Sequence, residues 1–356
     1  MMKIPLNILF IPVSSSEGIG EYMRSLILAD AIKQNWSNAN ICFILSKKAP
    51  YAKNCPFPSV LLESSPTKHV AEVNQIMTQF KPDLVIFDAS GRQSQLKHAY
   101  NVGAKVIFIS QHKRKRSRGL KLRRIAVTDK HWVAQPDFII GPISSFERLK
   151  LKIMHKNEPT CLGSIFPKPH KKQQELLLQK YDLEKNNFLL FNAGSGGHKK
   201  DNLLCIDILA EAAKKIAAET TIIPVIVYGS NYPHDLPKIK GVKCIHSLDN
   251  KDFINLLAVS KAAIISGGDT LLQAITLHKP TLAIPVSKDQ PARIAACKKN
   301  HLILDCSLNE KDIVKKTKKL MNNNVINTLM SNMQSMQQKN GLDICVNDIK
   351  ELLGDR

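Results

Sequence analysis

The stretch Ile265–Gln290 reads ISGGDTLLQAITLHKPTLAIPVSKDQ and decides the fold. The apolar run 262–265 predicts a buried strand, and two glycines with two small hydroxyl residues follow it. A helical pattern comes next, then His-Lys-Pro and a second apolar run. This order of strand, helix and strand is typical of a parallel sheet covered by helices.

The same alternation extends over the whole chain. In the first half we predict strands at 7–13, 40–45, 84–89, 105–110 and 138–143, and helices at 21–35, 69–80 and 92–103. In the second half we predict strands at 187–194, 221–229, 242–247, 262–268, 280–286 and 302–306. Helices are expected near 202–219, 251–259, 270–278, 290–299, 310–321, 325–338 and 343–353.

A turn-rich stretch, CLGSIFPKPHKKQ at 161–173, separates the two halves. We therefore predict an α/β protein with two Rossmann-like, doubly wound domains facing across a cleft. The N-terminal domain is expected over 1–162, the linker over 163–173 and the C-terminal domain over 174–338. A last helix within 339–356 is expected to pack back on the N-terminal domain.

The composition narrows the class of protein. Hydrophobic residues make up 44% of the chain but aromatic residues only 6%, which favours aliphatic cores. The eight cysteines have no CxxC spacing, so we expect reduced thiols, a cytosolic protein and no metal site. We interpret the N-terminal MMKIPLNILFIPVSSS as a strand and not a secretion signal, because prolines interrupt its short apolar run. No apolar run approaches the ~20 residues that span a bilayer, so we expect a soluble or peripheral protein.

The positive charge is concentrated in the first half. The net formal charge is +21, and residues 1–172 hold 27 Lys and Arg against 11 Asp and Glu. The segment His112–Arg124, HKRKRSRGLKLRR, contains eight basic residues and no acid. These residues are Lys113, Arg114, Lys115, Arg116, Arg118, Lys121, Arg123 and Arg124. They predict a surface that attracts phosphate, either at a membrane or on an acceptor molecule, and the alternative is a solvated loop. Nucleic acid is a less favoured partner, because few aromatic residues accompany the run.

Three glycine-rich turns follow predicted strands. They are SGGDT at Ser266–Thr270, GSGG at Gly194–Gly197 and SSSEGIGEYMR at Ser14–Arg24. Glycine lets a ligand approach the backbone, and the free N–H groups that begin a helix favour phosphate. The GSGG turn lacks Walker A spacing, and the N-terminal turn lacks the third glycine of a dinucleotide motif. For Asp269 the alternative is a structural role as a helix N-cap.

The segment GGDTLLQAITLHKPTLAIPVSKDQPARIAA resembles the C-terminal signature of GT-B glycosyltransferases of the MurG type. GIGEYMRSLILADAI is similar to the N-terminal loop and first helix of that superfamily, and of the related UDP-sugar hydrolases of pseudaminic acid synthesis. The resemblance implies a nucleotide-sugar donor, with UDP the expected nucleotide, bound mainly by the C-terminal domain. It implies no cofactor and no metal.

Carried over by this resemblance, the donor site comprises residues from several turns. Gly194, Ser195, Gly196, Gly197, Ser266, Gly267, Gly268, Asp269 and Thr270 would hold the diphosphate, and the backbone of Ser247 and Leu248 would contact the base. Gln273 stands where the family commonly has a ribose-binding glutamate. Asp289 and Gln290 would contact sugar hydroxyls, although Asp289 also suits a turn or helix cap.

The N-terminal domain would bind the acceptor through Gly18, Gly20, Arg24 and Asp88. Relatives often have histidine after the second glycine, and here Glu21 follows Gly20. Glu21 is therefore either the catalytic base or an acid that stabilises the helix start. His112 is a second candidate base, or else a surface histidine. Arg24 is expected to bind phosphate or pair with Glu21, and Asp88 to orient the acceptor or cap a helix.

The expected reaction is inverting, metal-independent transfer of a hexosyl or N-acetylhexosaminyl group to a lipid-linked or cell-envelope polysaccharide acceptor. The expected location is the cytoplasm, peripheral to the inner face of the membrane. Two alternatives remain open, namely a nucleotide-sugar hydrolase of the same fold and a non-catalytic binding protein.

Overall fold

The computed structural model describes residues 5–14 and 19–354, which form two compact units. Unit 1 contains the described residues up to Ile165 together with those from Asn340 onward, and unit 2 contains Phe166–Lys339. The division therefore falls inside the stretch that the sequence marks as a linker. Helix α8 (Lys171–Lys180) begins within that stretch, so the last three residues of the predicted linker are helical.

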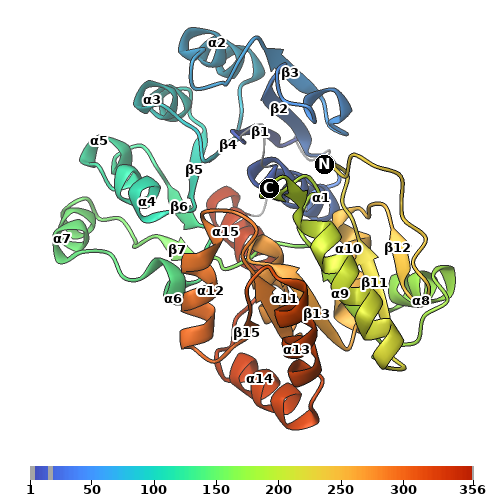
Figure 1. Ribbon diagram of the computed structural model, residues 1–356. Helices are drawn as coiled ribbons and strands as arrows, with labels where there is room; N and C mark the ends of the chain where they lie inside the picture. The colour runs from blue at the N-terminus through green and yellow to red at the C-terminus, as the bar shows by residue number, and fades with distance from the viewer. Residues whose placement is uncertain (1–4, 15–18, 355–356) are drawn as a thin grey trace. The chain divides into compact units, whose positions relative to one another are not determined.

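The sheet of unit 1 has seven parallel strands in the order β3-β2-β1-β4-β5-β6-β7 (Figure 1). The strands are β1 (Asn7–Pro12), β2 (Asn40–Ser46), β3 (Ser59–Leu62), β4 (Leu84–Asp88), β5 (Lys105–Ser110), β6 (Lys130–Val133) and β7 (Thr160–Cys161). The strand order reverses between β1 and β4. Ligands of such sheets bind beyond the carboxyl ends of the strands at this reversal.

Helices cover both faces of this sheet, because alternate strand residues point to opposite sides. Ile8 and Phe10 pack with α1 (Gly20–Asn35) and α15 (Gly341–Leu353), and Leu9 and Ile11 pack with α2 (Val70–Phe80) and α3 (Gln93–Asn101). The other helical segments of unit 1 are η1 (Ala52–Asn54), α4 (Lys113–Gly119), α5 (Leu122–Ile125), α6 (Asp137–Ile140) and α7 (Ser145–Ile153).

Helix α15 completes the core of unit 1 although it follows unit 2 in the sequence. Its residues Leu342, Cys345 and Ile349 are buried in the same cluster as Ile8 and Phe10. Polar contacts add to this packing, since Asp348 accepts hydrogen bonds from Trp132 Nε1 at 2.6 Å and from Lys130 Nζ at 3.1 Å.

Unit 2 has six parallel strands in the order β12-β11-β8-β13-β14-β15. They are β8 (Phe188–Asn192), β11 (Ile223–Val227), β12 (Lys243–Ile245), β13 (Ala262–Ser266), β14 (Thr281–Ile284) and β15 (Leu304–Asp305), and an antiparallel pair joins β9 (Lys199–Lys200) to β10 (Leu203–Leu204). The remaining helices are α9 (Cys205–Glu219), α10 (Asn250–Val259), α11 (Asp269–Thr276), α12 (Gln290–Lys299), α13 (Glu310–Leu320) and α14 (Asn323–Ser335). The prediction of two Rossmann-like α/β domains is confirmed.

The predicted strand at 138–143 is wrong. Residues Asp137–Ile140 form the short helix α6, which ends at Gly141 with φ +68°. Pro142 follows and has no N–H group to donate to a sheet ladder. The predicted strands also omit β3, β6 and β7, which have only two to four residues each.

Candidate functional site

Two glycine-rich turns lie side by side in unit 2. Strands β8 and β13 are parallel neighbours, with Phe191 opposite Ile264 and Asn192 opposite Ile265. The turns that follow them therefore leave the same edge of the sheet. A Cβ atom placed on Gly194 would lie 3.7 Å from Ser266 Oγ, so the two turns are in contact.

The glycines of these turns have different roles. A Cβ atom on Gly196 would lie 2.3 Å from the carbonyl oxygen of Tyr228, and one on Gly267 would lie 2.6 Å from Ile294. Both glycines are therefore required for close packing inside the unit. At Gly268 the nearest contacts of a Cβ atom would be Ser266 Oγ at 3.8 Å and Gln290 Nε2 at 3.9 Å. Gly268 is thus a position where the backbone stays accessible.

The N–H groups of the turns also divide into two classes. Gly194 donates to Asn192 Oδ1 at 2.9 Å, and Gly267 donates to Gln290 Oε1 at 3.1 Å. Among the described residues no acceptor is present for the N–H groups of Gly268, Asp269 and Thr270 at the start of α11. Helix starts carry partial positive charge, so these three groups can donate hydrogen bonds to an anion.

The start of α11 differs from the prediction. Gly268 is the N-cap and Asp269 is the first helical residue, so the alternative of Asp269 as N-cap is wrong. Ser195 and Gly197 lie in the neighbouring turn, where Ser195 is partly exposed and Gly197 is exposed. Ser247 and Leu248 follow β12 at the same sheet edge, with Ser247 exposed and Leu248 packed against the core.

Gln290 has a structural role that the sequence did not predict. Its Oε1 accepts from the N–H groups of Gly267 at 3.1 Å and Val286 at 2.9 Å, so this oxygen is not available to a sugar. Its Nε2 atom faces Gly268. Asp289 is exposed at the N-cap of α12 and accepts from Ser287 Oγ at 2.6 Å. Gln273 is buried, with 6% of its surface exposed.

Two further side chains at these turns were missed. Arg293 of α12 donates from Nη1 to the carbonyl oxygen of Gly267 at 2.7 Å, and its Nη2 lies 3.7 Å from Asp269 Oδ1. The His198 ring lies 3.6 Å from the Cβ position of Gly194. His198 directly follows the GSGG turn, which was a usable signal. Nothing in the sequence pattern connects Arg293 with the turn.

In unit 1, Glu21 lies in the first turn of α1 at the carboxyl edge of the sheet. Its Oε2 accepts from Ser14 Oγ at 3.1 Å, and its Oε1 is 4.0 Å from Lys115 Nζ. Gly20 is the first residue of α1, and Gly18 lies outside the described residues. His112 is exposed as the N-cap of α4, just beyond β5.

A cavity of about 150 Å³ opens at the same edge of unit 1, beyond β1 and β2. Its polar lining consists of Ser14, Ser46, Lys48, Tyr51 and Ser65. Ser14 thus borders both this cavity and the Glu21 carboxylate. A volume of this size holds roughly five water molecules, which corresponds to one small polar group of a ligand.

Arg24 and Asp88 form a buried ion pair. Arg24 donates from Nε to Asp88 Oδ2 at 2.8 Å and from Nη2 to Oδ1 at 2.7 Å. Arg24 is 5% exposed and Asp88 is fully buried. This corrects the prediction that both residues contact the acceptor directly, because Asp88 presents no accessible surface for it and Arg24 very little. Burial raises the pKa of Asp88 to about 6, although Arg24 opposes that rise.

The prediction that all eight basic residues of the segment 113–124 form a phosphate-attracting surface is wrong for Arg116 and Arg124. Arg116 donates to the carbonyl oxygens of Gly141 and Pro142, and Arg124 donates to the carbonyl oxygen of Gly91. Both arginines are buried, and desolvation lowers the pKa of Arg124 to about 10. Lys115 is half-buried, and five of the eight cations are exposed, namely Lys113, Arg114, Arg118, Lys121 and Arg123.

The described residues contain no group of three or more His, Cys, Asp or Glu side chains arranged to hold a metal ion. No described helix combines the length and the apolar character that a membrane span requires. All eight cysteines are free thiols.

Two parallel sheets, each wound with helices on both faces, place the chain in the GT-B class of folds. No protein-family model matches the chain, and no curated protein matches its sequence. Solved structures do match over almost the whole length. Spinosyn forosaminyltransferase SpnP has a TM-score of 0.66 at 13% identity, with 99% of this chain and 100% of that chain covered.

Two further solved structures also match almost the whole chain. MurG of Acinetobacter baumannii has a TM-score of 0.63 at 14% identity, with 98% of this chain and 100% of that chain covered. A protein described as a UDP-N-acetylglucosamine 2-epimerase of Listeria monocytogenes has a TM-score of 0.58 at 14% identity, with 99% and 98% covered. The expected MurG-like GT-B fold is therefore confirmed.

Proposed function

We propose that the chain is a glycosyltransferase that moves a sugar from a nucleoside-diphosphate donor, with UDP the expected nucleotide, to a lipid-linked or cell-envelope saccharide acceptor. The observation that carries this proposal is the contact between the turns after β8 and β13, beside the free N–H groups of Gly268, Asp269 and Thr270. The names of the similar transferases, SpnP and MurG, support it at the level of fold.

The donor diphosphate is assigned to unit 2. Its oxygens would accept from the three free N–H groups of α11 and from Gln290 Nε2, which points to the same turn. Arg293 supplies positive charge at the turn and fixes its geometry through the carbonyl oxygen of Gly267. Donors that are held in place before the reaction stabilise developing charge without reorganisation, so this binding mode requires no metal.

The proposed chemical step is a single inverting displacement. An acceptor hydroxyl oxygen bonds to the anomeric carbon while the bond from that carbon to the phosphate oxygen breaks. The nucleoside diphosphate leaves with the electron pair of that bond. The hydroxyl proton passes to the Glu21 carboxylate, which is 15% exposed. Binding of the acceptor next to Glu21 is assigned to unit 1, where the cavity that Ser14 borders is the candidate subsite.

A thermal-shift screen with UDP-, GDP-, CMP- and dTDP-sugars tests the donor assignment. A ligand at 100 times its Kd should stabilise the protein by ~2.7 kcal/mol. Arg293→Met should weaken the binding about tenfold, whereas Lys298→Met on the same helix should not, because Lys298 pairs with Asp305. If both variants bind the donor equally well, Arg293 does not contribute to the donor site.

Incubation with the selected nucleotide-sugar alone separates transfer from hydrolysis. A transferase should release little nucleotide until an acceptor is added, whereas rapid release from the donor alone would indicate a hydrolase. Glu21→Ala and Ser266→Ala should each lower the transfer rate. If both variants retain the wild-type rate, the assigned site is wrong.

We also infer an anionic membrane as the partner of unit 1, at the cytoplasmic face where lipid-linked acceptors are expected. The buried residues Leu120, Ile125, Ile143 and Leu151 join α7 to the basic segment 113–124. The outer face of α7 exposes Phe146, Leu149 and Ile153, with 66%, 51% and 63% of their surfaces accessible. Their spacing of three and four residues places them on one side of the helix.

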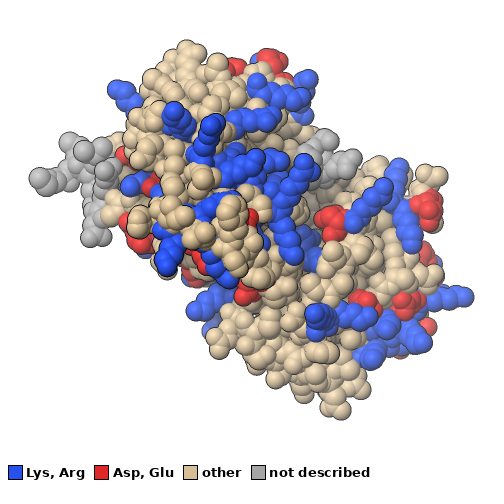
Figure 2. All heavy atoms as spheres, turned by 90° about the vertical axis from the view of Figure 1, so that its left-hand side faces the viewer, with Lys and Arg blue, Asp and Glu red and all other residues tan. Residues whose placement is uncertain are grey.

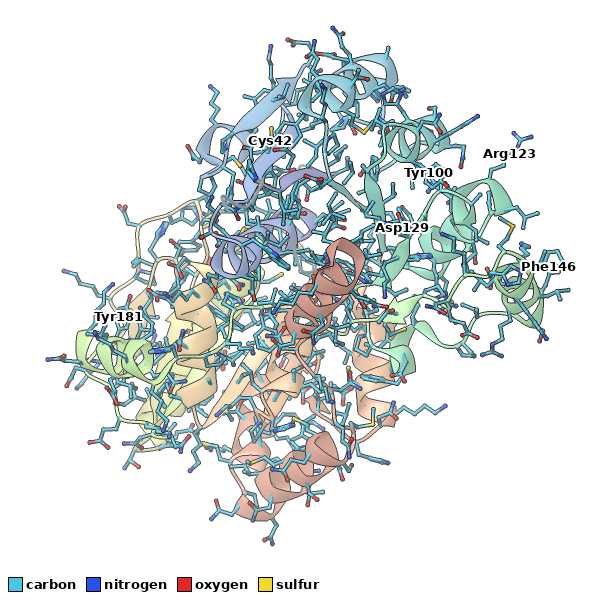
Figure 3. The ribbon with its side chains drawn as sticks, turned by 180° about the vertical axis from the view of Figure 1, so that it is seen from behind. Cys42, Tyr100, Arg123, Asp129, Phe146 and Tyr181 are labelled. Carbon is cyan, nitrogen blue, oxygen red and sulfur yellow. The ribbon has the colours of Figure 1, made fainter. Side chains whose placement is uncertain are left out.

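The five exposed cations of the basic segment accompany this apolar face. Figure 2 views the side of unit 1 that bears α4, α5 and α7, and it shows many Lys and Arg side chains gathered there. Figure 3 shows Phe146 and Arg123 at the periphery of the unit. An apolar helix face with surrounding cations suits an anionic lipid surface, where each Lys or Arg contributes ~1 kcal/mol.

Vesicle sedimentation tests this inference. Vesicles with 30% anionic lipid should bind the protein, and binding should fall at high salt. Phe146→Ser with Leu149→Ser should reduce binding at least tenfold. The control is Leu176→Ser with Leu203→Ser, which removes two exposed leucines of unit 2. Equal loss in both variants would exclude α7 as the membrane contact.

A further inference from the structure

The buried ion pair between Arg24 and Asp88 has an unusual position for a purely structural feature. Asp88 ends β4 at the strand-order reversal, and Arg24 lies one turn after Glu21 on α1. A buried pair of charges costs desolvation energy, and apolar side chains of the same volume often stabilise a core as well or better.

Gln111 connects the pair to Glu21. With its amide oriented to match its neighbours, Gln111 Oε1 accepts from Arg24 Nη1 at 3.0 Å and Nη2 at 2.7 Å, and its Nε2 donates to Glu21 Oε1 at 3.3 Å. This orientation follows from chemistry, since a guanidinium only donates and a carboxylate only accepts. Asp88, Arg24, Gln111 and Glu21 thus form one continuous chain of hydrogen bonds.

The other oxygen of Glu21 is held from the opposite side. Ser14 Oγ donates to Oε2 at 3.1 Å and itself accepts the N–H of Tyr22 at 3.0 Å. The carboxylate is therefore fixed between the residues that follow β1 and β5. Each of these contacts lies within unit 1.

We propose that Asp88, Arg24 and Gln111 are positioning residues that hold the Glu21 carboxylate in one orientation toward the acceptor hydroxyl. This rests on the proposed function, in which Glu21 receives the proton. Asp88 balances the charge of Arg24, and the neutral Gln111 amide links Arg24 to Glu21 with a single donated hydrogen bond. None of the three residues needs to touch the substrate.

Carbon-13 NMR of protein labelled at the glutamate carboxyl carbons tests the coupling without any substrate. The Glu21 resonance is identified by its loss in Glu21→Gln. Gln111→Met and Asp88→Asn should each move or broaden that resonance, although Asp88 does not touch Glu21. The control Gln93→Met removes an equivalent amide from α3, where it donates to the Arg123 carbonyl oxygen, and should leave the resonance unchanged.

An unchanged Glu21 resonance in Gln111→Met would overturn the proposal. This variant keeps the buried ion pair intact, so it remains informative if Asp88→Asn fails to fold. Transfer kinetics provide a second measurement, in which Gln111→Met should lower kcat at least tenfold and change the donor KM less than twofold. If Glu21→Gln retains full activity, the assignment of the base fails. If Glu21→Gln is inactive but Gln111→Met is not, only the positioning roles fail.

Discussion

Ser266 Oγ lies 3.7 Å from the point where a Cβ atom on Gly194 would be, so the turns after β8 and β13 form one continuous surface. The contact arises because β8 and β13 are adjacent parallel strands that end at the same edge. Mutations at the glycines of this surface should therefore separate its packing role from its proposed role in binding the donor.

Gly196→Ala should destabilise unit 2, whereas Gly268→Ala should impair nucleotide binding without a large loss of stability. Gly196 has φ +91°, and its new Cβ would overlap the Tyr228 carbonyl oxygen, so we expect a loss of more than about 2 kcal/mol. For Gly268→Ala we expect the free energy of unfolding to fall by less than about 1 kcal/mol. Urea unfolding and UDP titration measure the two effects. A Gly268→Ala protein that binds UDP normally would contradict this division.

Asp348→Ala should lower the free energy of unfolding of unit 1 by about 2–3 kcal/mol. The change removes a charged acceptor from Trp132 Nε1 and Lys130 Nζ, and hydrogen bonds to charged groups are worth about 1.5–3 kcal/mol. Asp343→Ala on the same helix serves as the control and should cost less than Asp348→Ala. Tryptophan fluorescence during urea unfolding reports the difference, and equal losses in both variants would contradict it.

His131 should make the stability of unit 1 depend on pH. Burial against Phe108 and the charges of Arg116 and Arg124 lower the pKa of His131 to about 3, while Glu147 opposes them. As the pH falls below the ordinary value of 6.5, the unfolded chain binds a proton that the folded chain excludes. The stabilising effect of the neutral His131 side chain is therefore complete above pH 6.5 and is lost toward pH 3. The free energy of unfolding should fall by up to ~1.4 kcal/mol per pH unit over this range.

The variant His131→Gln isolates this effect, because glutamine can keep a hydrogen bond to Ser110 but does not titrate in this range. Its unfolding free energy should fall less steeply than that of the wild type between about pH 6.5 and 4.5. If the unfolding free energies of the two proteins change with pH in parallel, His131 does not contribute to the pH dependence of stability.

The thiols should react with a disulfide reagent in two groups. Cys55, Cys161 and Cys244 are partly exposed, so they should react first in the native protein. Cys42, Cys205, Cys297, Cys306 and Cys345 are buried and should react only on unfolding. Burial raises the pKa of Cys297 and of Cys306 to about 12, which slows them further. Rapid native labelling at Cys345 would show that α15 detaches from unit 1.

The sequence predicted the long elements and the two glycine-rich turns of unit 2 because both depend on local patterns. Helices such as α9 and strands such as β13 have clear periodicity or apolar runs, and the glycines mark where the chain turns. The wrong strand prediction came from the same kind of local pattern. At 138–143 an apolar run became a helix and a loop, because Gly141 and Pro142 prevent an extended strand.

The polar networks could not be read from local patterns. Arg24 and Asp88 are 64 residues apart, and Gln111 directly follows a third element, β5, so only the sheet topology brings them together. For the same reason the basic segment appeared uniform, although Arg116 and Arg124 turn inward to satisfy backbone carbonyl oxygens. The partners of Arg116 lie 25 and 26 residues away in the sequence, and the partner of Arg124 lies 33 residues away.

The return of residues 340–353 to the core of unit 1 has a consequence for biosynthesis. A nascent chain exposes the apolar side of α1 while the ribosome translates residues 166–339, which takes roughly 9–35 s at ~5–20 residues per second. At the end of that interval the whole of unit 2 has been translated, whereas unit 1 still lacks the residues from Asn340 onward. The uncovered side of α1 is the surface on which ribosome-associated chaperones would be expected to act.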